Sequence, residues 1–273
     1  MTMKIAVSGL GLIGGSFYKA SLAAGYDTIG LHHGESDGLS TADIVVVAQP
    51  PDAIVPWVKA NAVHFKPGAI VFDICGIKRQ IMRDLGEFFS IEKSINRKIE
   101  KFSFVGGHPM AGREVSGYAN SLPDLFVGAS MILTPFPDTD PAVIDTLKEY
   151  FRKIGFGMTV VTTPEKHDEM IAFTSQLCHV IATAYTRDKR VADSIGFSAG
   201  SYANMTRVAT QNADDWSSLY LSDREPLLEV LDGFISRLQD FRSALADRDR
   251  DRMKRYIIEG TNAKRSEIEA RYG

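Results

Sequence analysis

The sequence predicts an α/β fold, in which an N-terminal parallel sheet with helices between its strands is followed by an all-helical C-terminal part. Two observations lead to this prediction. Over residues 4–162, short apolar runs alternate with turn residues and helical stretches, which is typical of parallel strands joined by crossover helices. From Thr163 onward, apolar residues recur at helical spacing almost throughout. We therefore expect one domain over residues 1–162 and a second over residues 163–273.

Length and charge indicate a two-domain globular protein that acts on small molecules. The chain has 273 residues, enough for two domains with cores of their own. Charged residues make up 24% and the formal net charge is -3, so no feature of the charge points to nucleic acid or a membrane surface as a partner. No apolar stretch approaches the roughly 20 residues that a membrane span requires.

Cysteine usage indicates a reducing compartment. Cys75 and Cys178 are the only cysteines, and they lie far apart in the sequence without metal-ligand spacing. We therefore expect neither a disulfide nor a metal site, and a cytoplasmic location is the simplest account.

The first strand leads into a glycine-rich turn. Residues 5–7 form an apolar run, followed by Gly9, Gly11 and Gly14 and then by residues at helical spacing. In this strand-turn-helix context, the first glycine permits the turn, the second lets a pyrophosphate approach and the third lets helix and strand pack closely. The pattern favours a Rossmann-type dinucleotide-binding domain. The alternative is a turn that merely connects two packed elements.

The adenosine side of this domain departs from the usual pattern. After the second expected strand, residues 28–31, such folds usually carry an acidic residue that holds the ribose of NAD, but here His32 and His33 follow. No arginine follows to hold the 2′-phosphate of NADP. We expect NAD or NADP, with a slight preference for NAD. Residues 33–42 are too few for a crossover helix, so this side of the fold is expected to be abbreviated.

The remaining strands are expected to bring polar side chains to one edge of the sheet. Residues 42–55 are predicted to form a strand, a Pro-Pro turn and the start of a helix, and further strands are predicted over residues 69–73, 102–105, 129–134 and 158–162. Asp52 is expected to cap the helix that starts after the Pro-Pro turn, and Thr163 the first helix of the second domain, with Pro164 at its first position. Because ligands bind at the carboxyl ends of parallel strands, we expect Asp73, Gly76 and Lys78 there. His108 is expected on a loop at the same edge.

Four side chains are candidates for chemistry. His108 lies among glycines and could serve as a general base, or could simply cap a turn. Gln176 and His179 are three residues apart on a predicted helix and share a face. The alternative for His179 is a core histidine whose hydrogen bonds are satisfied within the protein. Arg207 is an isolated cation in a small, apolar helix, which suits either capture of a carboxylate or a buried ion pair.

The motifs together resemble a known family. GLGLIGGS, DICGIK, GGHPMAGRE with LFVGASMILTP, HDEMIAFTSQLCH, and TRVA followed by DDWSSLYLSDRE occur in that order. This set is similar to the prephenate/arogenate dehydrogenase family of tyrosine biosynthesis over nearly the whole chain. The resemblance implies an N-terminal Rossmann domain, a C-terminal helical domain that builds a homodimer, and an active site in the cleft between the two.

The resemblance also implies roles for individual residues. His108 matches the catalytic histidine, which accepts a hydrogen bond or proton from the ring hydroxyl of the substrate, and Lys78 matches a lysine that helps to hold substrate. His179 and Arg207 match substrate-binding residues, and Gln176 is expected beside them. Cofactor contacts are expected at Gly9, Leu10, Gly11, Leu12, Ile13, Gly14, His32, Gln49, Pro50, Asp73 and Gly76.

The chain departs from the family pattern at three positions. Gly76 stands where the family usually has a serine that contacts both nicotinamide and substrate. Losing that hydrogen bond is expected to cost on the order of 1 to 3 kcal/mol in the transition state, unless a neighbour replaces it. Gln176 replaces a histidine and cannot change charge near neutral pH. Arg113 stands where a small residue is common and could add a cation near the substrate.

The implied reaction is NAD(P)-dependent oxidative decarboxylation of prephenate to 4-hydroxyphenylpyruvate, without a metal. One alternative is an arogenate dehydrogenase that gives tyrosine directly. Another, from a different class, is a catalytically weak dinucleotide-binding regulator, suggested by Gly76, Gln176 and the shortened second-strand region. A β-hydroxyacid dehydrogenase fits the architecture but leaves the HPMAG segment unexplained.

Overall fold

The computed structural model describes residues 2–32, 34–94, 102–113 and 115–272. His33, one of the two histidines considered for the adenosine site, lies outside the described residues. By compactness, the chain splits into two units, residues 1–224 and residues 225–273. The expected boundary after residue 162 stays a prediction, because compactness groups the helices that follow it with the sheet.

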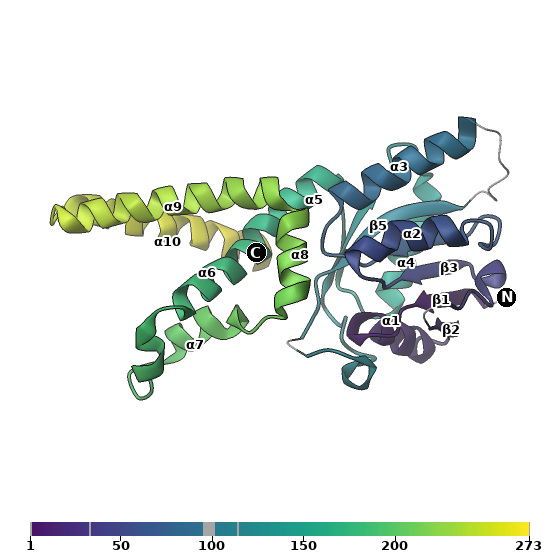
Figure 1. Ribbon diagram of the computed structural model, residues 1–273, viewed down its shortest axis with the longest axis horizontal. Helices are drawn as coiled ribbons and strands as arrows, with labels where there is room; N and C mark the ends of the chain where they lie inside the picture. The colour runs from purple at the N-terminus through teal and green to yellow at the C-terminus, as the bar shows by residue number, and fades with distance from the viewer. Residues whose placement is uncertain (1, 33, 95–101, 114, 273) are drawn as a thin grey trace. The chain divides into compact units, whose positions relative to one another are not determined.

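A sheet of seven strands organises the described part of the first unit, in the order β2-β1-β3-β4-β5-β6-β7 (Figure 1). Strands β1 to β5 are parallel, whereas β6 runs antiparallel to β5 and β7 runs parallel to β6. In chain order the strands are β1 (Lys4–Ser8), β2 (Asp27–Leu31), β3 (Ile44–Val47), β4 (Ile70–Asp73), β5 (Ser103–Pro109), β6 (Ser130–Pro135) and β7 (Met158–Val161).

Helices cover both faces of the sheet. One apolar cluster joins the sheet to α1 (Leu12–Ala23) and α4 (Pro141–Lys153), and includes Phe17 and Phe126, whose ring centroids are 4.4 Å apart. A second cluster joins the opposite face to α2 (Pro51–Asn61) and α3 (Arg79–Ser94). Near-continuous apolar strands such as β3, which is fully buried, are typical of a parallel sheet that is covered on both sides.

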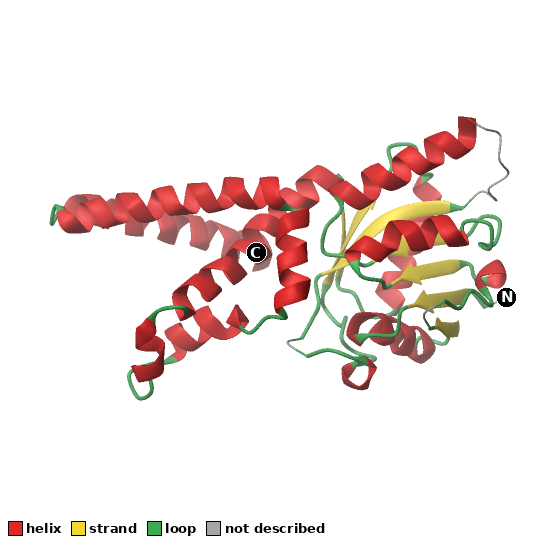
Figure 2. Cartoon of the chain, in the orientation of Figure 1, coloured by secondary structure: helices red, strands yellow, loops and turns green. Residues whose placement is uncertain are grey.

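The chain beyond β7 is helical, as Figure 2 shows in red. Helices α9 and α10 form the second unit almost entirely, and the rings of Phe241 and Tyr256 meet across them with centroids 6.1 Å apart. No helix of the described residues is long and apolar enough to cross a membrane. The helices are α5 (Pro164–Ile171), α6 (Leu177–Thr186), α7 (Gly200–Thr206), α8 (Ala213–Ser222), α9 (Arg224–Ala246) and α10 (Arg250–Tyr272).

The predicted fold class is confirmed, including its abbreviated second crossover. Between β2 and β3 the described residues form one short 3-10 turn, Leu39–Thr41, in place of a crossover helix. Strand β1 lies between β2 and β3, so the carboxyl ends of β1 and β3 border the point where the strand order reverses, which is where open α/β sheets bind ligands. Thr163 caps α5 as expected, because its hydroxyl accepts a 3.2 Å hydrogen bond from the Lys166 N–H.

Two local predictions were wrong. Asp52 does not cap α2, because that helix starts at Pro51 with Pro50 as its N-cap, and Asp52 lies within the first turn. His108 is not on a loop but inside β5, opposite Ile132 of β6. The preceding glycines suggested a loop, yet Gly107 is needed for packing, since a Cβ there would lie 2.4 Å from the Asp73 carbonyl oxygen.

Candidate active site

The glycine-rich turn between β1 and α1 is closely packed at Gly9 and Gly14 but has free space at Gly11. Gly9 has a φ of +95°, and a Cβ at this position would lie 2.2 Å from the Ala48 carbonyl oxygen. A Cβ on Gly14 would lie 1.9 Å from the Gly9 carbonyl oxygen, whereas one on Gly11 would meet no described atom within 4 Å. Gly11 is also the N-cap of α1 and supplies no capping side chain. The turn therefore has the shape and the helix N-terminus that suit a pyrophosphate.

Several of the other residues expected around a dinucleotide lie close to this turn. Leu10 packs against Gly30 of β2, where an added Cβ would lie 2.8 Å from its Cδ1. The Gln49 side-chain amide donates a 2.9 Å hydrogen bond to the Ser8 hydroxyl at the end of β1. Leu12 and Ile13 open α1, and Pro50 precedes α2. The fold thus gathers these residues at the carboxyl ends of β1 and β3.

A carboxylate that the sequence analysis missed lies just beyond β2. The backbone N–H of His32 donates a 2.8 Å hydrogen bond to Glu35 Oε2. Glu35 stands four residues after the end of β2, beyond the position at which the sequence pattern looks for an acidic residue. The adenosine side therefore carries a negative charge that His32 and His33 alone did not indicate.

A buried ion pair fixes the loop after β4. Asp73 and Lys78 both have fully buried side chains, and Lys78 Nζ donates to Asp73 Oδ2. Asp73 also accepts hydrogen bonds from the backbone N–H groups of Cys75 at 2.9 Å and Gly107 at 3.1 Å. The pair therefore ties the β4 loop to β5. The expected contacts of these two side chains with cofactor and substrate stay predictions.

A chain of three side chains joins β5 to α5. His108 Nδ1 lies 2.9 Å from His167 Nε2, and His167 Nδ1 lies 2.7 Å from Asp168 Oδ1. The Asp168 carboxylate also accepts 2.8 Å hydrogen bonds from the backbone N–H groups of Lys78 and Arg79, at the start of α3. His167 and Asp168 are both almost completely buried. We call His108, His167 and Asp168 the relay.

The relay determines which nitrogen of His108 carries its proton. A carboxylate can only accept, so His167 Nδ1 donates to Asp168, which leaves His167 Nε2 as an acceptor. His108 Nδ1 therefore donates to His167, and His108 Nε2 has a free lone pair. Burial, the neighbouring His167 and the Lys78 ammonium hold the pKa of His108 well below its ordinary value. His108 is thus a neutral base at neutral pH.

Gly76 leaves space beside this base. An added Cβ on Gly76 would lie 3.8 Å from His108 Nε2 and 3.7 Å from Leu219 Cδ1 of α8, which are ordinary contact distances. The free nitrogen of His108 therefore lies next to a position without a side chain. The Cys75 thiol, next to Gly76 in the chain, does not compete with His108 as a base, because burial raises the pKa of Cys75 to about 11.

His179 belongs to a second group of residues, built by α6, α8 and the turn after α7. His179 Nδ1 donates a 3.0 Å hydrogen bond to the Val208 carbonyl, and its ring lies against Trp216 with centroids 3.8 Å apart. Arg207 directly precedes Val208 and is exposed. Trp216 and Leu219 are three residues apart on α8, so one helix contacts both His179 and the Gly76 position.

Gln176 is hydrogen-bonded neither to the relay nor to the group around His179, among the described residues. Its side chain is fully buried in a π-helical turn, Ala172–Gln176, and its amide donates a 2.9 Å hydrogen bond to Asp223 Oδ2. Its Oε1 is buried without a hydrogen-bond partner among the described residues. Arg113 donates to the Asn120 carbonyl at 3.2 Å. Among the described residues, no hydrogen bond joins either side chain to the relay.

Comparisons with known proteins agree with this fold. The family model described as "Prephenate dehydrogenase, nucleotide-binding domain" matches residues 19–160, and that described as "Prephenate dehydrogenase, dimerization domain" matches residues 163–259. A cyclohexadienyl dehydrogenase of Zymomonas mobilis is 30% identical, with 95% of this chain and 94% of the relative covered.

Two solved structures share the fold across almost their whole length. The Synechocystis arogenate dehydrogenase superposes with a TM-score of 0.81 at 24% identity, covering 97% of this chain and 100% of its own. The prephenate dehydrogenase from A. aeolicus, in complex with hydroxyphenyl propionate and NAD+, gives a TM-score of 0.78 at 24% identity. The match covers 98% of this chain and 99% of that chain. With both family models matched in order along its length, the chain belongs to the prephenate dehydrogenase family, the dehydrogenases of tyrosine biosynthesis.

Proposed function

We propose that the protein catalyses the NAD-dependent oxidative decarboxylation of prephenate to 4-hydroxyphenylpyruvate, with His108 as the base. The observation that carries this proposal is the relay, which leaves His108 Nε2 unprotonated at neutral pH and places it beside Gly76, where an added Cβ would lie 3.8 Å from it. A neutral imidazole with one fixed proton is suited to accept a proton from an alcohol.

In this mechanism His108 Nε2 accepts the proton of the carbinol hydroxyl as its carbon becomes a carbonyl. When bound, the nicotinamide supplies a hydride acceptor for that carbon. Loss of carbon dioxide makes the ring aromatic, and His108 returns its proton to the new phenolic oxygen. Throughout, His108 Nδ1 keeps its hydrogen bond to His167, so the ring does not rotate between the two proton transfers. The pKa of His108 lies below its ordinary value, which favours return of the proton.

We assign the remaining residues by their place in the structure. Arg207 is exposed and next to Val208, which holds His179, so we propose that Arg207 and His179 bind the substrate side-chain carboxylate. Lys78 and Asp73 are buried and paired, so we propose that they position the loop after β4 and lower the pKa of His108 through the Lys78 charge.

The turn residues and their neighbours support a nicotinamide dinucleotide as cofactor. We propose that Gly9, Gly11 and Gly14 cradle its pyrophosphate, with Leu10, Leu12, Ile13, Gln49, Pro50 and Gly76 along its length. Glu35 supports NAD over NADP, because its carboxylate, bonded to the His32 N–H, would repel a 2′-phosphate. Replacing Glu35 with Gln should therefore lower the ratio of NAD to NADP activity.

A second candidate substrate is arogenate, which differs from prephenate by an amino group on the side chain. The relative that is 30% identical is named for a cyclohexadienyl substrate, a class that includes both compounds. Assays that cross prephenate and arogenate with NAD and NADP test substrate and cofactor together. Tight binding of NAD without turnover of either substrate would instead indicate a dinucleotide-binding regulator.

His108→Asn tests the proposed base, and His64→Asn, an exposed histidine, is its matched control. We expect His108→Asn to lower kcat by about a hundredfold or more while substrate affinity changes little, because the proton then has no acceptor. His64→Asn should behave as wild type. Wild-type turnover by His108→Asn would remove this residue from the mechanism.

We also propose that the chain forms a homodimer through its helical part. On α9, Leu228, Ile235, Leu238 and Leu245 are exposed and recur at intervals of seven, three and seven residues, which places them along one face of the helix. The model matched by residues 163–259 is described as a dimerization domain. Leu238→Asp should shift the mass in solution toward a monomer, whereas the exposed Arg152→Gln should not.

The cysteines support a cytoplasmic location for this enzyme. Cys75 is buried and Cys178 is exposed, and both are free thiols. Free thiols persist where the surroundings are reducing. We propose this location on that ground, and fractionation of the cells that make the protein would test it.

A further inference from the structure

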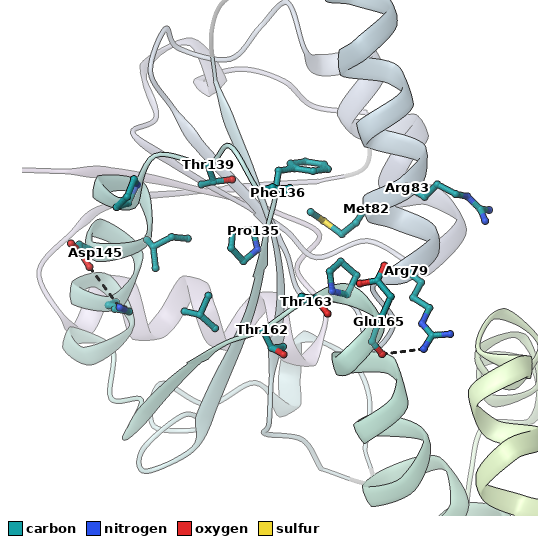
Figure 3. A pocket seen from close by; sticks show the side chains of 16 residues that line it. Arg79, Met82, Arg83, Pro135, Phe136, Thr139, Asp145, Thr162, Thr163 and Glu165 are labelled. Carbon is teal, nitrogen blue, oxygen red and sulfur yellow. Dashed lines mark hydrogen bonds and ion pairs between the residues drawn. The ribbon is translucent and has the colours of Figure 1, made fainter.

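We propose that a pocket on the first unit, whose lining contains no member of the relay, binds a small organic carboxylate with an apolar body. The cavity has a volume of about 940 Å³ and lies between α3, the end of β6, the start of α4 and the segment from β7 into α5. Figure 3 shows its lining side chains. This volume falls in the range of small-molecule sites in proteins.

The floor and walls of the pocket are largely apolar. Met82 and Ile144 form parts of the two core clusters. Pro135 ends β6 and Phe136 follows it (Figure 3). Val161, at the end of the edge strand β7, is 46% exposed and lines the pocket. An apolar ligand body would remove this side chain from water, which is favourable in proportion to the area covered.

Arg79 supplies an anchor for a carboxylate. Its Nη2 donates a 3.1 Å hydrogen bond to the Glu165 carbonyl, drawn in Figure 3, but its Nε–H is buried without a partner among the described residues. A guanidinium offers five donors in a planar fork, which matches the two oxygens of a carboxylate. Nη2 carries a second N–H besides the one donated to Glu165, so Nε and Nη2 together still offer two donors to a ligand.

The charges around the pocket favour an anion. Arg83 lies four residues after Arg79 on α3 and lines the same wall. Lys148 lies 3.7 Å from Asp145, so these two charges offset each other. Arg83 Nε lies 3.4 Å from Asp84 Oδ1, so this guanidinium has a carboxylate partner outside the lining. The lining itself carries three cations and two anions, and a carboxylate ligand would balance them.

Octanoate is a suitable probe, and octan-1-ol is its neutral counterpart. Isothermal titration of the NAD-saturated protein should show octanoate binding at least about tenfold more tightly than octan-1-ol, because one charge-assisted contact is worth that factor. Arg79→Gln should weaken the binding of octanoate by about tenfold or more. The control Arg152→Gln removes an exposed arginine of α4 that does not line the pocket, and should bind as wild type.

Two further variants separate this site from the proposed substrate site and from loss of folding. Arg207→Ala should bind octanoate as wild type; loss of binding in that variant would place the probe in the substrate site and overturn the proposal. Val161→Asp puts a carboxylate on an exposed wall position, and should repel octanoate even if Arg79→Gln unfolds. Equal affinity for octanoate and octan-1-ol, or wild-type affinity in Arg79→Gln and Val161→Asp, would also overturn it.

Discussion

His167 Nε2 lies 2.9 Å from His108 Nδ1, and this contact makes a residue of α5 the partner of a base on β5. Because His167 is in turn bonded to Asp168, it can only accept from His108. The tautomer of the base is therefore set by a neighbouring helix and not by β5 itself.

His167→Asn should lower kcat with little change in KM. Without His167 the ring of His108 can rotate and adopt the wrong tautomer, a loss we expect to reach about tenfold to a hundredfold. Burial is the chief cause that lowers the pKa of His108 and electrostatic repulsion by His167 is the next, so removing the His167 ring should let this pKa rise toward its ordinary value. The acid limb of kcat/KM should therefore move to higher pH, and an unmoved profile would reduce His167 to a structural role.

Stability should fall as the pH drops below about 6.5, the ordinary histidine value. The pKa values of His108 and His167 are both lowered in the folded chain, chiefly by burial. Between the folded and unfolded pKa values the unfolded chain binds more protons, so acid favours unfolding; above the unfolded value this loss is absent. Urea unfolding at several pH values measures it, and the slope should flatten in His108→Asn.

Gly76→Ser should fold normally and raise kcat. A Cβ fits at this position at 3.7 Å or more from its neighbours, and the added hydroxyl would lie near His108 Nε2. If that hydroxyl restores a polarising hydrogen bond, we expect a gain of about tenfold to a hundredfold. Gly76→Ala adds the same Cβ without the hydroxyl and should give no gain. Equal rates for the serine and alanine variants would show that the hydroxyl does nothing.

Arg207→Ala should raise KM for the substrate by about tenfold or more, because a charge-assisted contact with a carboxylate is lost. The change in kcat should be smaller. Arg190→Ala, another exposed arginine, is the matched control, since it pairs locally with Asp188. An unchanged KM in Arg207→Ala would remove this residue from substrate binding.

Much of the fold could be predicted because its signals are local. The apolar runs of β1, β3 and β4 and the glycine turn predict a parallel sheet with a dinucleotide site, and the sheet confirms that fold. His108 was misplaced on a loop because Gly106 and Gly107 are loop formers in isolation. In β5 they are required by close neighbours, Thr134 Oγ1 at 2.2 Å and the Asp73 carbonyl at 2.4 Å from their added Cβ atoms.

The relay could not be predicted from the residues alone, because its members are far apart in sequence. His108 and His167 are separated by 59 positions. His167 and Asp168 both lie in the HDEM segment that carries part of the family resemblance, and an adjacent histidine and aspartate in the first turns of a helix was the signal available. Nothing in the spacing indicated that they would be buried against β5 and α3.

The hydrogen bonds of the Asp168 carboxylate mean that the two matched domains of this chain cannot be separated without loss. Asp168 lies within the residues matched as a dimerization domain, yet it holds the main chain of Lys78 and Arg79, which lie within the nucleotide-binding match. Residues 1–162 produced alone would lack both the cap of α3 and the partner of His108. A chimera of two relatives joined at this boundary would keep its chemistry only if the parent of the C-terminal part places a histidine and an aspartate at the positions of His167 and Asp168.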